Sequence, residues 1–212
     1  MNINTDPLNI SKNDDIFETY FDSGQLRDRV TVKNGKIDGV LEYYYESGQL
    51  ATKVNYVNGK LDGLLETYYE NGMLEATGVN KNDKQEGIWE KFYKSGKLLM
   101  RMNYKNDKNH GPTYSYYENG QLRNEAHYKS GKLHGIVKKY FETGQLEAQV
   151  KYKDGKQHGL QETFYKNGQL EEKVKFKDGQ PNGPWEHFDE NGNLLEKRNY
   201  DEGTIKKDKD IS

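Results

Sequence analysis

The chain lacks several features on which common protein classes depend. It has no cysteine, which excludes disulfides, thiolate nucleophiles and cysteine-bound zinc. No apolar run approaches the roughly 18 residues of a membrane span, and the polar stretch 1–15 has no apolar core of a signal peptide. Lys and Arg (32) nearly balance Asp and Glu (34), so there is no basic footprint for nucleic acid. We therefore expect neither a nucleic-acid partner nor a membrane span.

Aliphatic residues are also scarce, whereas aromatic residues are not. Only 32% of the 212 residues are hydrophobic, while 12% are aromatic and 17 residues are tyrosines. This composition favours a thin sheet covered by amphipathic rings over a thick aliphatic core.

A 24-residue repeat runs through the sequence without losing register. Glycine recurs at one position of the repeat, and leucine recurs two residues later, without substitution in either column. The columns are Gly24, Gly48, Gly72, Gly96, Gly120, Gly144, Gly168, Gly192 and Leu26, Leu50, Leu74, Leu98, Leu122, Leu146, Leu170, Leu194. A fixed period of this length indicates an array of one supersecondary unit. Because each unit contacts mainly its neighbours, the array argues against a single compact active site.

Each repeat has the pattern of a β-hairpin. In residues 39–62, two runs rich in aromatic and β-branched residues flank Glu-Ser-Gly-Gln, and a second link, Asn-Gly-Lys, leads onward. Glycine is too frequent for stable helices. We predict an all-β fold: an elongated, twisted single antiparallel sheet of about eight hairpin repeats. The predicted array spans residues 15–203, between a flexible segment 1–14 and a polar tail 204–212.

The hairpin register can be predicted from charge. A two-residue loop, Ser47-Gly48, pairs Tyr45 with Leu50, Leu41 with Val54, and Glu42 with Lys53. The opposite-charge pair recurs as Glu18/Arg29, Glu90/Arg101, Glu162/Lys173 and Glu186/Lys197, and each such pair stabilises by roughly 0.2–1 kcal/mol. A three-residue loop with a bulge would slip this pairing, so we predict the two-residue loop.

This register places aromatic columns on both faces of the sheet. One face combines the leucines with Phe21, Tyr45, Tyr69, Tyr93, Tyr117, Phe141, Tyr165 and with Tyr56, Tyr104, Tyr128, Tyr152, Phe176, Tyr200. The other face combines Glu and Lys with Tyr20, Tyr44, Tyr68, Phe92, Tyr116, Tyr140, Phe164, Phe188. Twist, curling or a bound partner must cover such a sheet.

Three histidines share one position of the repeat: His110, His134 and His158. Stacked imidazoles could form a zinc or nickel ladder. However, the same column holds Asp38, Asp62, Glu86 and Asn182, which favours a small polar linker residue. We predict no metal and no cofactor.

The two edges of the predicted sheet differ in charge. Lysines fill the linkers (Lys33, Lys36, Lys81, Lys84, Lys105, Lys108, Lys129, Lys132, Lys153, Lys156), whereas the hairpin tips are acidic (Asp22, Glu46, Glu70, Glu118, Glu142, Glu190). This polarity could steer a charged partner. Because Asp83, Asp107, Asp154 and Asp178 offset the lysines, a solvated rim that prevents aggregation explains it better.

The repeat departs from its own pattern between residues 73 and 116. Gly78 replaces a strand valine, Asp83 and Asp107 replace linker glycines, and Lys94 and Lys97 make a basic tip. Methionines cluster at 100 and 102, and Pro112 and Tyr114 replace apolar and Glu residues. These departures are either drift within a tolerant array or a partner-binding patch. Since aromatic and Arg side chains dominate such patches, the candidate partner-binding residues are Trp89, Phe92, Tyr93, Lys94, Lys97, Arg101, Tyr114 and Tyr116.

The repeat resembles the MORN repeat, and more closely its bacterial variant. The resemblance rests on Asn58-Gly59-Lys60-Leu61-Asp62-Gly63 with Tyr68-Tyr69-Glu70-Asn71-Gly72, and on Lys132-Leu133-His134-Gly135 with residues 140–146. It covers about residues 16–203 and implies hairpins joined in one long twisted sheet. Bacterial proteins made only of this variant resemble the antitoxins of toxin–antitoxin systems, and similar chains serve as immunity proteins.

The resemblance therefore implies a cytoplasmic bacterial antitoxin or immunity protein that binds a toxin directly, rather than an enzyme. Carboxylates are plentiful, but every Glu column repeats, whereas a catalytic site needs one distinct cluster. A general protein scaffold and a phospholipid-surface binder, for which the lysine edge would fit, are the alternatives.

Overall fold

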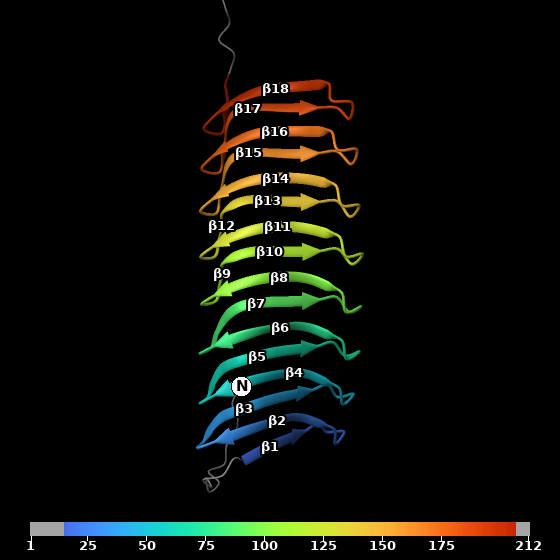
Figure 1. Cartoon of the computed structure of the whole chain (residues 1–212), viewed down its shortest axis with the longest axis vertical. Helices are drawn as coiled ribbons and strands as arrows, with labels where there is room; N and C mark the ends of the chain where they lie inside the picture. Colours follow the sequence, from blue (N-terminus) through green and yellow to red (C-terminus); the bar gives the residue numbers. More distant parts are fainter. Residues whose placement is uncertain (1–14, 207–212) are drawn as a thin grey trace, which may run out of the picture. The chain divides into compact units, whose positions relative to one another are not determined.

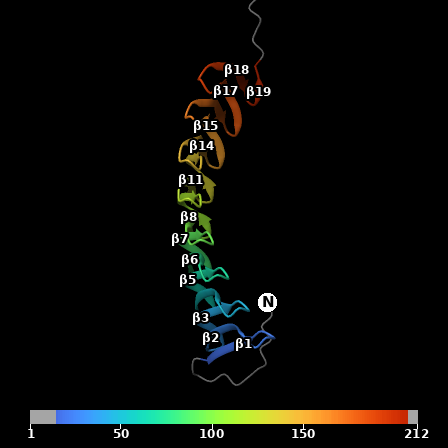
Figure 2. The ribbon, with the colours of Figure 1, turned by 90° about the vertical axis from the view of Figure 1, so that its right-hand side faces the viewer.

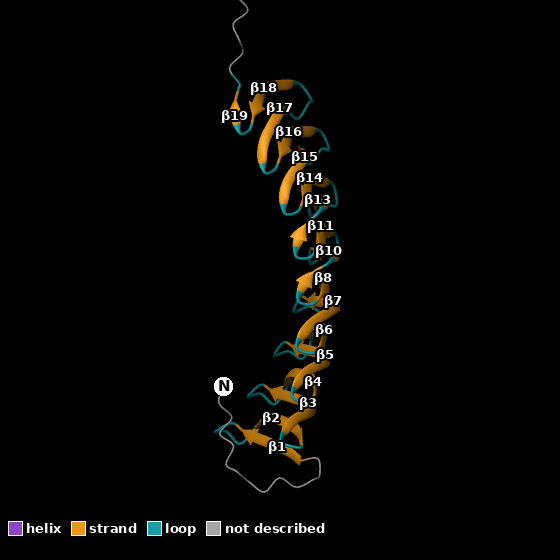
Figure 3. Cartoon of the chain, turned by 90° about the vertical axis from the view of Figure 1, so that its left-hand side faces the viewer, coloured by secondary structure: helices purple, strands orange, loops and turns teal. Residues whose placement is uncertain are grey.

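The computed structural model describes residues 15–206, so the predicted flexible segment 1–14 and residues 207–212 of the predicted tail lie outside the described part. The chain divides into two compact units, residues 1–96 and 97–212. The described residues form nineteen β-strands without a helix (Figure 3). All strand pairings within the two units are antiparallel, which confirms the predicted all-β antiparallel fold.

The first unit contains seven strands, each paired with its neighbours in sequence (Figure 1). They are β1 (Asp15–Tyr20), β2 (Leu26–Lys33), β3 (Lys36–Tyr44), β4 (Leu50–Val57), β5 (Lys60–Tyr68), β6 (Leu74–Lys81) and β7 (Lys84–Phe92). Glycine at each tip and at each link separates strands rich in β-branched and aromatic residues, and this alternation produces the meander.

The second unit repeats the same scheme, with two of its long strands interrupted. Its strands are β8 (Leu98–Lys105), β9 (Lys108–Asn109), β10 (Gly111–Tyr116), β11 (Leu122–Lys129), β12 (Lys132–Leu133), β13 (Gly135–Tyr140), β14 (Leu146–Lys153), β15 (Lys156–Phe164), β16 (Leu170–Lys177), β17 (Gln180–Phe188), β18 (Leu194–Asp201) and β19 (Thr204–Ile205). The short strand β19 pairs with β18, so regular structure extends two residues beyond the predicted end of the array at 203.

Two kinds of turn alternate along the chain. At the links, two residues connect the strands: Val57 pairs with Lys60, and Asn58 and Gly59 both have positive φ (51° and 81°), as a type I′ turn requires. At the tips, the Tyr45 N–H donates to the Gln49 carbonyl, and the Gly48 N–H donates to the Tyr45 carbonyl, both over 2.8 Å. Gly48 has φ 88°, which explains the invariant glycine.

The predicted two-residue loop at the tip is therefore wrong. Three residues, 46–48, lie between the hydrogen-bonded pair Tyr45 and Gln49, and Leu50 faces Tyr44 rather than Tyr45. A β-bulge at Ala51 then shifts the register back by one residue, because Tyr43 pairs with Thr52. As a result, the predicted pairs Leu41/Val54 and Glu42/Lys53 are correct.

Each unit is a single layer of strands, and the strands curve along their length (Figure 2). No helix or second sheet in residues 15–206 covers either face. The core is correspondingly thin. The buried hydrophobic side chains in the described residues are Leu41, Val54, Trp89, Met102 and Val174, and each occupies the repeat position of either Leu41 or Val54.

Candidate protein-binding surface

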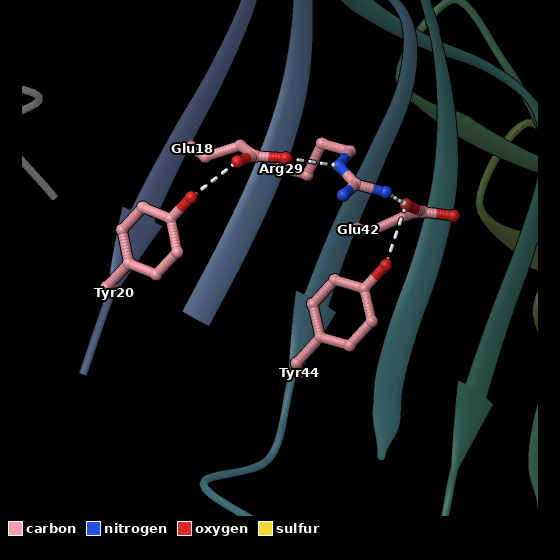
Figure 4. Close-up of polar contacts among 5 residues, drawn as sticks. All are labelled: Glu18, Tyr20, Arg29, Glu42 and Tyr44. Atoms are coloured by element: carbon pink, nitrogen blue, oxygen red, sulfur yellow. Dashed lines mark hydrogen bonds and ion pairs between the residues drawn. The ribbon is translucent and has the colours of Figure 1, made fainter. Parts of the chain in front are cut away.

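A ladder of alternating charges crosses β1 to β5 on one face, and Figure 4 shows its first members. Arg29 lies between two carboxylates, with Nε 2.7 Å from Glu18 and Nη1 3.8 Å from Glu42. Glu42 also faces Lys53, which faces Glu66 in turn. The ladder therefore continues from one hairpin to the next and is not confined to pairs within a hairpin.

Tyrosine hydroxyls of the same face complete this ladder. Tyr20 donates to Glu18 over 2.6 Å, and Tyr44 donates to Glu42 over 2.9 Å (Figure 4). The Tyr20 hydroxyl, together with Arg29, holds the pKa of the Glu18 carboxyl below its ordinary value. These contacts confirm that the Tyr20 and Tyr44 column shares a face with the Glu and Lys residues.

In the second unit the same positions of the repeat carry charge pairs, one of which is inverted. Glu186 accepts from Lys173 over 2.6 Å and from Lys197 over 2.9 Å, and these contacts lower its pKa. At the inversion, Glu125 occupies a position that is basic in most repeats and lies 3.7 Å from Lys138, which occupies a Glu position. The predicted pairs Glu18/Arg29, Glu42/Lys53, Glu162/Lys173 and Glu186/Lys197 are confirmed. Glu90 and Arg101 belong to different units.

A second set of tyrosines, located at the tips, links successive repeats. Their hydroxyls donate to main-chain carbonyls of the following repeat: Tyr45 to Tyr68, Tyr69 to Phe92, Tyr117 to Tyr140 and Tyr165 to Phe188, over 2.6–2.8 Å. Each of these tyrosines thus fastens one repeat to the next. Joining repeats is a structural role, and it accounts for this aromatic column of the sequence without a bound partner.

Four candidate partner-binding residues lie at the end of the first unit. Trp89 is buried, its indole covers Gly78, and its Nε1–H donates to the Val79 carbonyl over 3.2 Å. Phe92 and Tyr93 are half-buried. Lys94 is exposed at the tip, with its ammonium 5.9 Å from the centre of the Tyr69 ring. Lys94 is therefore the charged and exposed member of this group.

The other four candidates lie in the second unit and gather around a shallow hollow of about 470 Å³. Lys97, Arg101 and Tyr116 line it, and Tyr114 lies opposite Arg101 on the neighbouring strand. Lys97 also donates to the Glu118 carbonyl over 2.8 Å. Arg101 is exposed, whereas both tyrosines are half-buried. The hollow combines a basic rim with an aromatic wall.

Some departures from the repeat have a structural explanation instead. Asp83 takes a left-handed conformation (φ 66°) where other links have glycine, and its carboxylate accepts from the Leu61 N–H over 2.8 Å. This hydrogen bond offsets the cost of the unfavourable φ. Asn103 likewise donates to the Pro112 carbonyl over 2.6 Å.

The three histidines occupy equivalent places at successive links. Their Nδ1 atoms approach the next link, 3.4 Å from the Ser130 N–H for His110, and 3.6 and 3.5 Å from the Asp154 and Asp178 carboxylates for His134 and His158. Asp38 uses the same place to accept from the Asn58 N–H. Residues 15–206 contain no group of three or more His, Asp or Glu side chains arranged to hold a metal ion.

Sequence reasoning did not foresee that the ladder joins successive hairpins or that Trp89 covers Gly78. The sequence did carry a signal for the continuous ladder, because a Glu of the next hairpin faces each of these basic residues. Glu42 faces Arg29, and Glu66 faces Lys53.

Repeated two-stranded hairpins with type I′ links, stacked into a single-layer sheet, define a repeat protein with extended faces instead of an enclosed site. The MORN repeat variant family matches residues 37–58, 61–80, 85–106, 109–130, 133–154, 157–178 and 181–202. The chain therefore belongs to the MORN repeat variant family. The β1–β2 hairpin precedes the first matched segment and has the same register, with Glu18 opposite Arg29.

Other comparisons add little. Comparison with curated proteins finds no match. A solved structure titled "Crystal Structure of TcdB2-TccC3-Cdc42" is similar at 13% identity with a TM-score of 0.25, over 91% of this chain and 13% of that chain. The chain thus spans about an eighth of the length of that protein, and the low TM-score supports no inference about function. Within residues 15–206, no helix is long and apolar enough to cross a membrane.

Proposed function

We propose that this chain is a non-catalytic, cytoplasmic bacterial antitoxin or immunity protein that neutralises a partner toxin by direct binding. Membership of a repeat family built for binding supports a binding role, and the extended faces of each unit offer large contact areas. That the partner is a toxin goes beyond the family assignment and is the specific part of this proposal.

The observation that carries the proposal is the position of the divergent charged side chains. Residues that are identical in every repeat cannot distinguish one partner from another, whereas exposed departures can. Lys94 and Lys97 are exposed departures, and Lys97 lines the hollow together with Tyr116 and with Arg101, an exposed basic residue of the charge ladder. A partner with an acidic rim and an apolar or aromatic centre complements this surface.

The test is expression of the chain with the product of the adjacent gene. We expect the two proteins to co-purify, and the chain to restore growth to cells that express its neighbour. Normal growth of a deletion strain while every adjacent gene is expressed would contradict the proposal.

Charge reversal assigns the contact surface. We expect Lys94→Glu or Arg101→Glu to weaken toxin binding at least about tenfold, which is the size of effect of one lost interfacial charge contact. Lys177→Glu, an exposed lysine of a link outside residues 73–116, is the matched control. Unchanged affinity in both variants would identify the departures as drift.

A phospholipid surface is the second candidate, because lysines face each other directly at the links. Lys81 pairs with Lys84, Lys105 with Lys108, and Lys129 with Lys132, although like charges in register are destabilising. An anionic membrane would neutralise them. Failure to float with vesicles containing phosphatidylserine at low salt would exclude this function. A general scaffold instead predicts several partners of modest affinity in the same co-purification.

A further inference from the structure

The outermost strands of the described residues, β1 and β18, each leave one edge uncovered. Among the strands of residues 15–206, β1 pairs with β2 alone. β18 pairs with β17 along one side, and on its other side β19 covers only Tyr200 and Asp201. The backbone of residues 194–198 is therefore open on that side within residues 15–206. Such edges are templates for pairing with another strand.

The side chains at these two edges are unusually exposed for their positions in the repeat. Phe17 is 50% exposed, whereas its equivalent Leu41 is 6% exposed. At the other edge, Leu194 and Leu195 are 52% and 60% exposed. Terminal repeats of stable arrays normally present a polar outer face, whereas these two edges include the exposed side chains of Phe17, Leu194 and Leu195.

The charge ladder is also incomplete at both edges, with opposite signs. Interior members have two partners: Arg29 lies between Glu18 and Glu42, and Glu186 lies between Lys173 and Lys197. Glu18 faces one basic residue, Arg29, and Lys197 faces one carboxylate, Glu186. The β1 edge thus ends on a negative charge and the β18 edge on a positive charge.

We propose that two copies of this chain associate head to tail, with β1 of one copy pairing antiparallel with β18 of another. The interior register defines the contact. Arg29 faces Glu42 and Asp28 faces Tyr43 between hairpins, and Lys173 faces Glu186 in the same way. The same register places Glu18 of one copy opposite Lys197 of the other, and Thr19 opposite Glu196.

This pairing extends both the charge ladder and the apolar row across the contact between the two copies. Glu186, Lys197, Glu18 and Arg29 become four consecutive members of the ladder. In the apolar row, Arg198 lies over Trp185, with its guanidinium carbon 4.9 Å from the ring centre, and also pairs with Glu196 over 2.5 Å. The same register places Phe17 of the other copy opposite Arg198, which brings a second aromatic ring to this cation.

The contact is one short strand pair, so association is weak and reversible. Because the interface is heterologous, each copy in a pair keeps one edge to which a further copy can add. This inference is independent of toxin binding.

Intermolecular disulfide trapping tests the register directly, since the chain has no cysteine of its own. Directly paired residues of antiparallel strands lie close enough for a disulfide. We expect the full chain with Thr19→Cys and Glu196→Cys to give a ladder of oligomers on a non-reducing gel after mild oxidation. The control Thr19→Cys with Arg198→Cys, two residues out of register, should give far less.

Charge exchange tests the same contact without a covalent bond. Sedimentation of the wild-type chain from about 10 µM to 1 mM, the range for small interfaces, should show increasing mass. Lys197→Glu should lower the association constant at least tenfold, while Lys177→Glu should not. Adding Glu18→Lys to Lys197→Glu should restore association. A monomer at every concentration, or equal cross-linking by both cysteine pairs, would overturn the proposal.

Discussion

The indole of Trp89 lies directly over Gly78 on the neighbouring strand. A β-carbon at residue 78 would stand 2.1 Å from Cδ2 of the indole, which leaves no room for any other amino acid. Trp89 is only 8% exposed. Its ring alone provides the buried apolar contact that the side chains of Leu41 and Val54 provide together in another repeat. The two departures from the repeat thus compensate each other.

Replacing one partner alone is therefore expected to destabilise the first unit. Gly78→Val restores the usual residue of the column but overpacks against the ring, at a cost of about 1–3 kcal/mol. Trp89→Leu leaves the glycine uncovered, at a cost of about 2–4 kcal/mol. Thermal unfolding followed by circular dichroism should show both losses.

The double variant provides the control. Gly78→Val with Trp89→Leu recreates the Leu/Val pair of the preceding repeat, so it should be more stable than either single variant. Additive losses would contradict the pairing.

The sequence predicts the periodic features of the fold well, because each is enforced by one residue type. Glycine at a positive φ marks every tip, and opposite charges such as Glu42 and Lys53 mark the register. The tip loop could not be predicted from these charges, since the bulge at Ala51 cancels the extra loop residue before the charged pair is reached. The charged pairs therefore depend on the combined effect of the extra loop residue and the bulge, and they reveal neither feature separately.

The candidate surface was less predictable than the fold. In the sequence Gly78 is a departure and Trp89 a candidate partner-binding residue, and only the folded structure shows that one covers the other. Likewise, the sequence shows only that Tyr69 belongs to an aromatic column, whereas the structure shows that its hydroxyl donates to the Phe92 carbonyl. A one-residue change in register would have moved either side chain to the other face.

The tyrosines that fasten successive repeats can be tested by removing one oxygen atom. Tyr165 donates to the Phe188 carbonyl over 2.8 Å, and Tyr165→Phe should cost about 0.5–1.5 kcal/mol in unfolding free energy. Phe141 occupies the same column in the preceding repeat without a hydroxyl, so Phe141→Tyr should stabilise by a similar amount. Chemical denaturation of both variants measures this, and equal midpoints for all three proteins would show that the hydroxyls contribute nothing.

The inverted pair Glu125 and Lys138 tests whether the ladder depends on sign alone. Glu125→Lys places two lysines opposite each other and should cost about 0.2–1 kcal/mol. Adding Lys138→Glu should recover most of that loss and give the order of charges found in other repeats. The difference should shrink in 1 M salt, where the Debye length is about 3 Å; a salt-independent loss would point to packing instead.

Acid should weaken the second unit through Glu186. Its contacts with Lys173 and Lys197 lower its pKa in the folded chain below the ordinary value of 4.5. Its stabilising contribution is therefore present above about pH 4.5 and is lost as the pH falls through the lower, folded pKa. Melting temperatures between pH 6 and 3 should fall less steeply for Glu186→Gln than for the wild type. Parallel curves for the two proteins would contradict this role.

The central claim, that the chain acts by binding one protein partner directly, is tested most directly by isothermal titration of the purified chain with the purified product of the adjacent gene. The account predicts one saturable complex with Kd of about 1 µM or tighter, equivalent to roughly 8 kcal/mol, and loss of the toxin's activity at the same stoichiometry. No detectable heat at about 100 µM protein, roughly a hundredfold above that Kd, together with undiminished toxin activity, would contradict it.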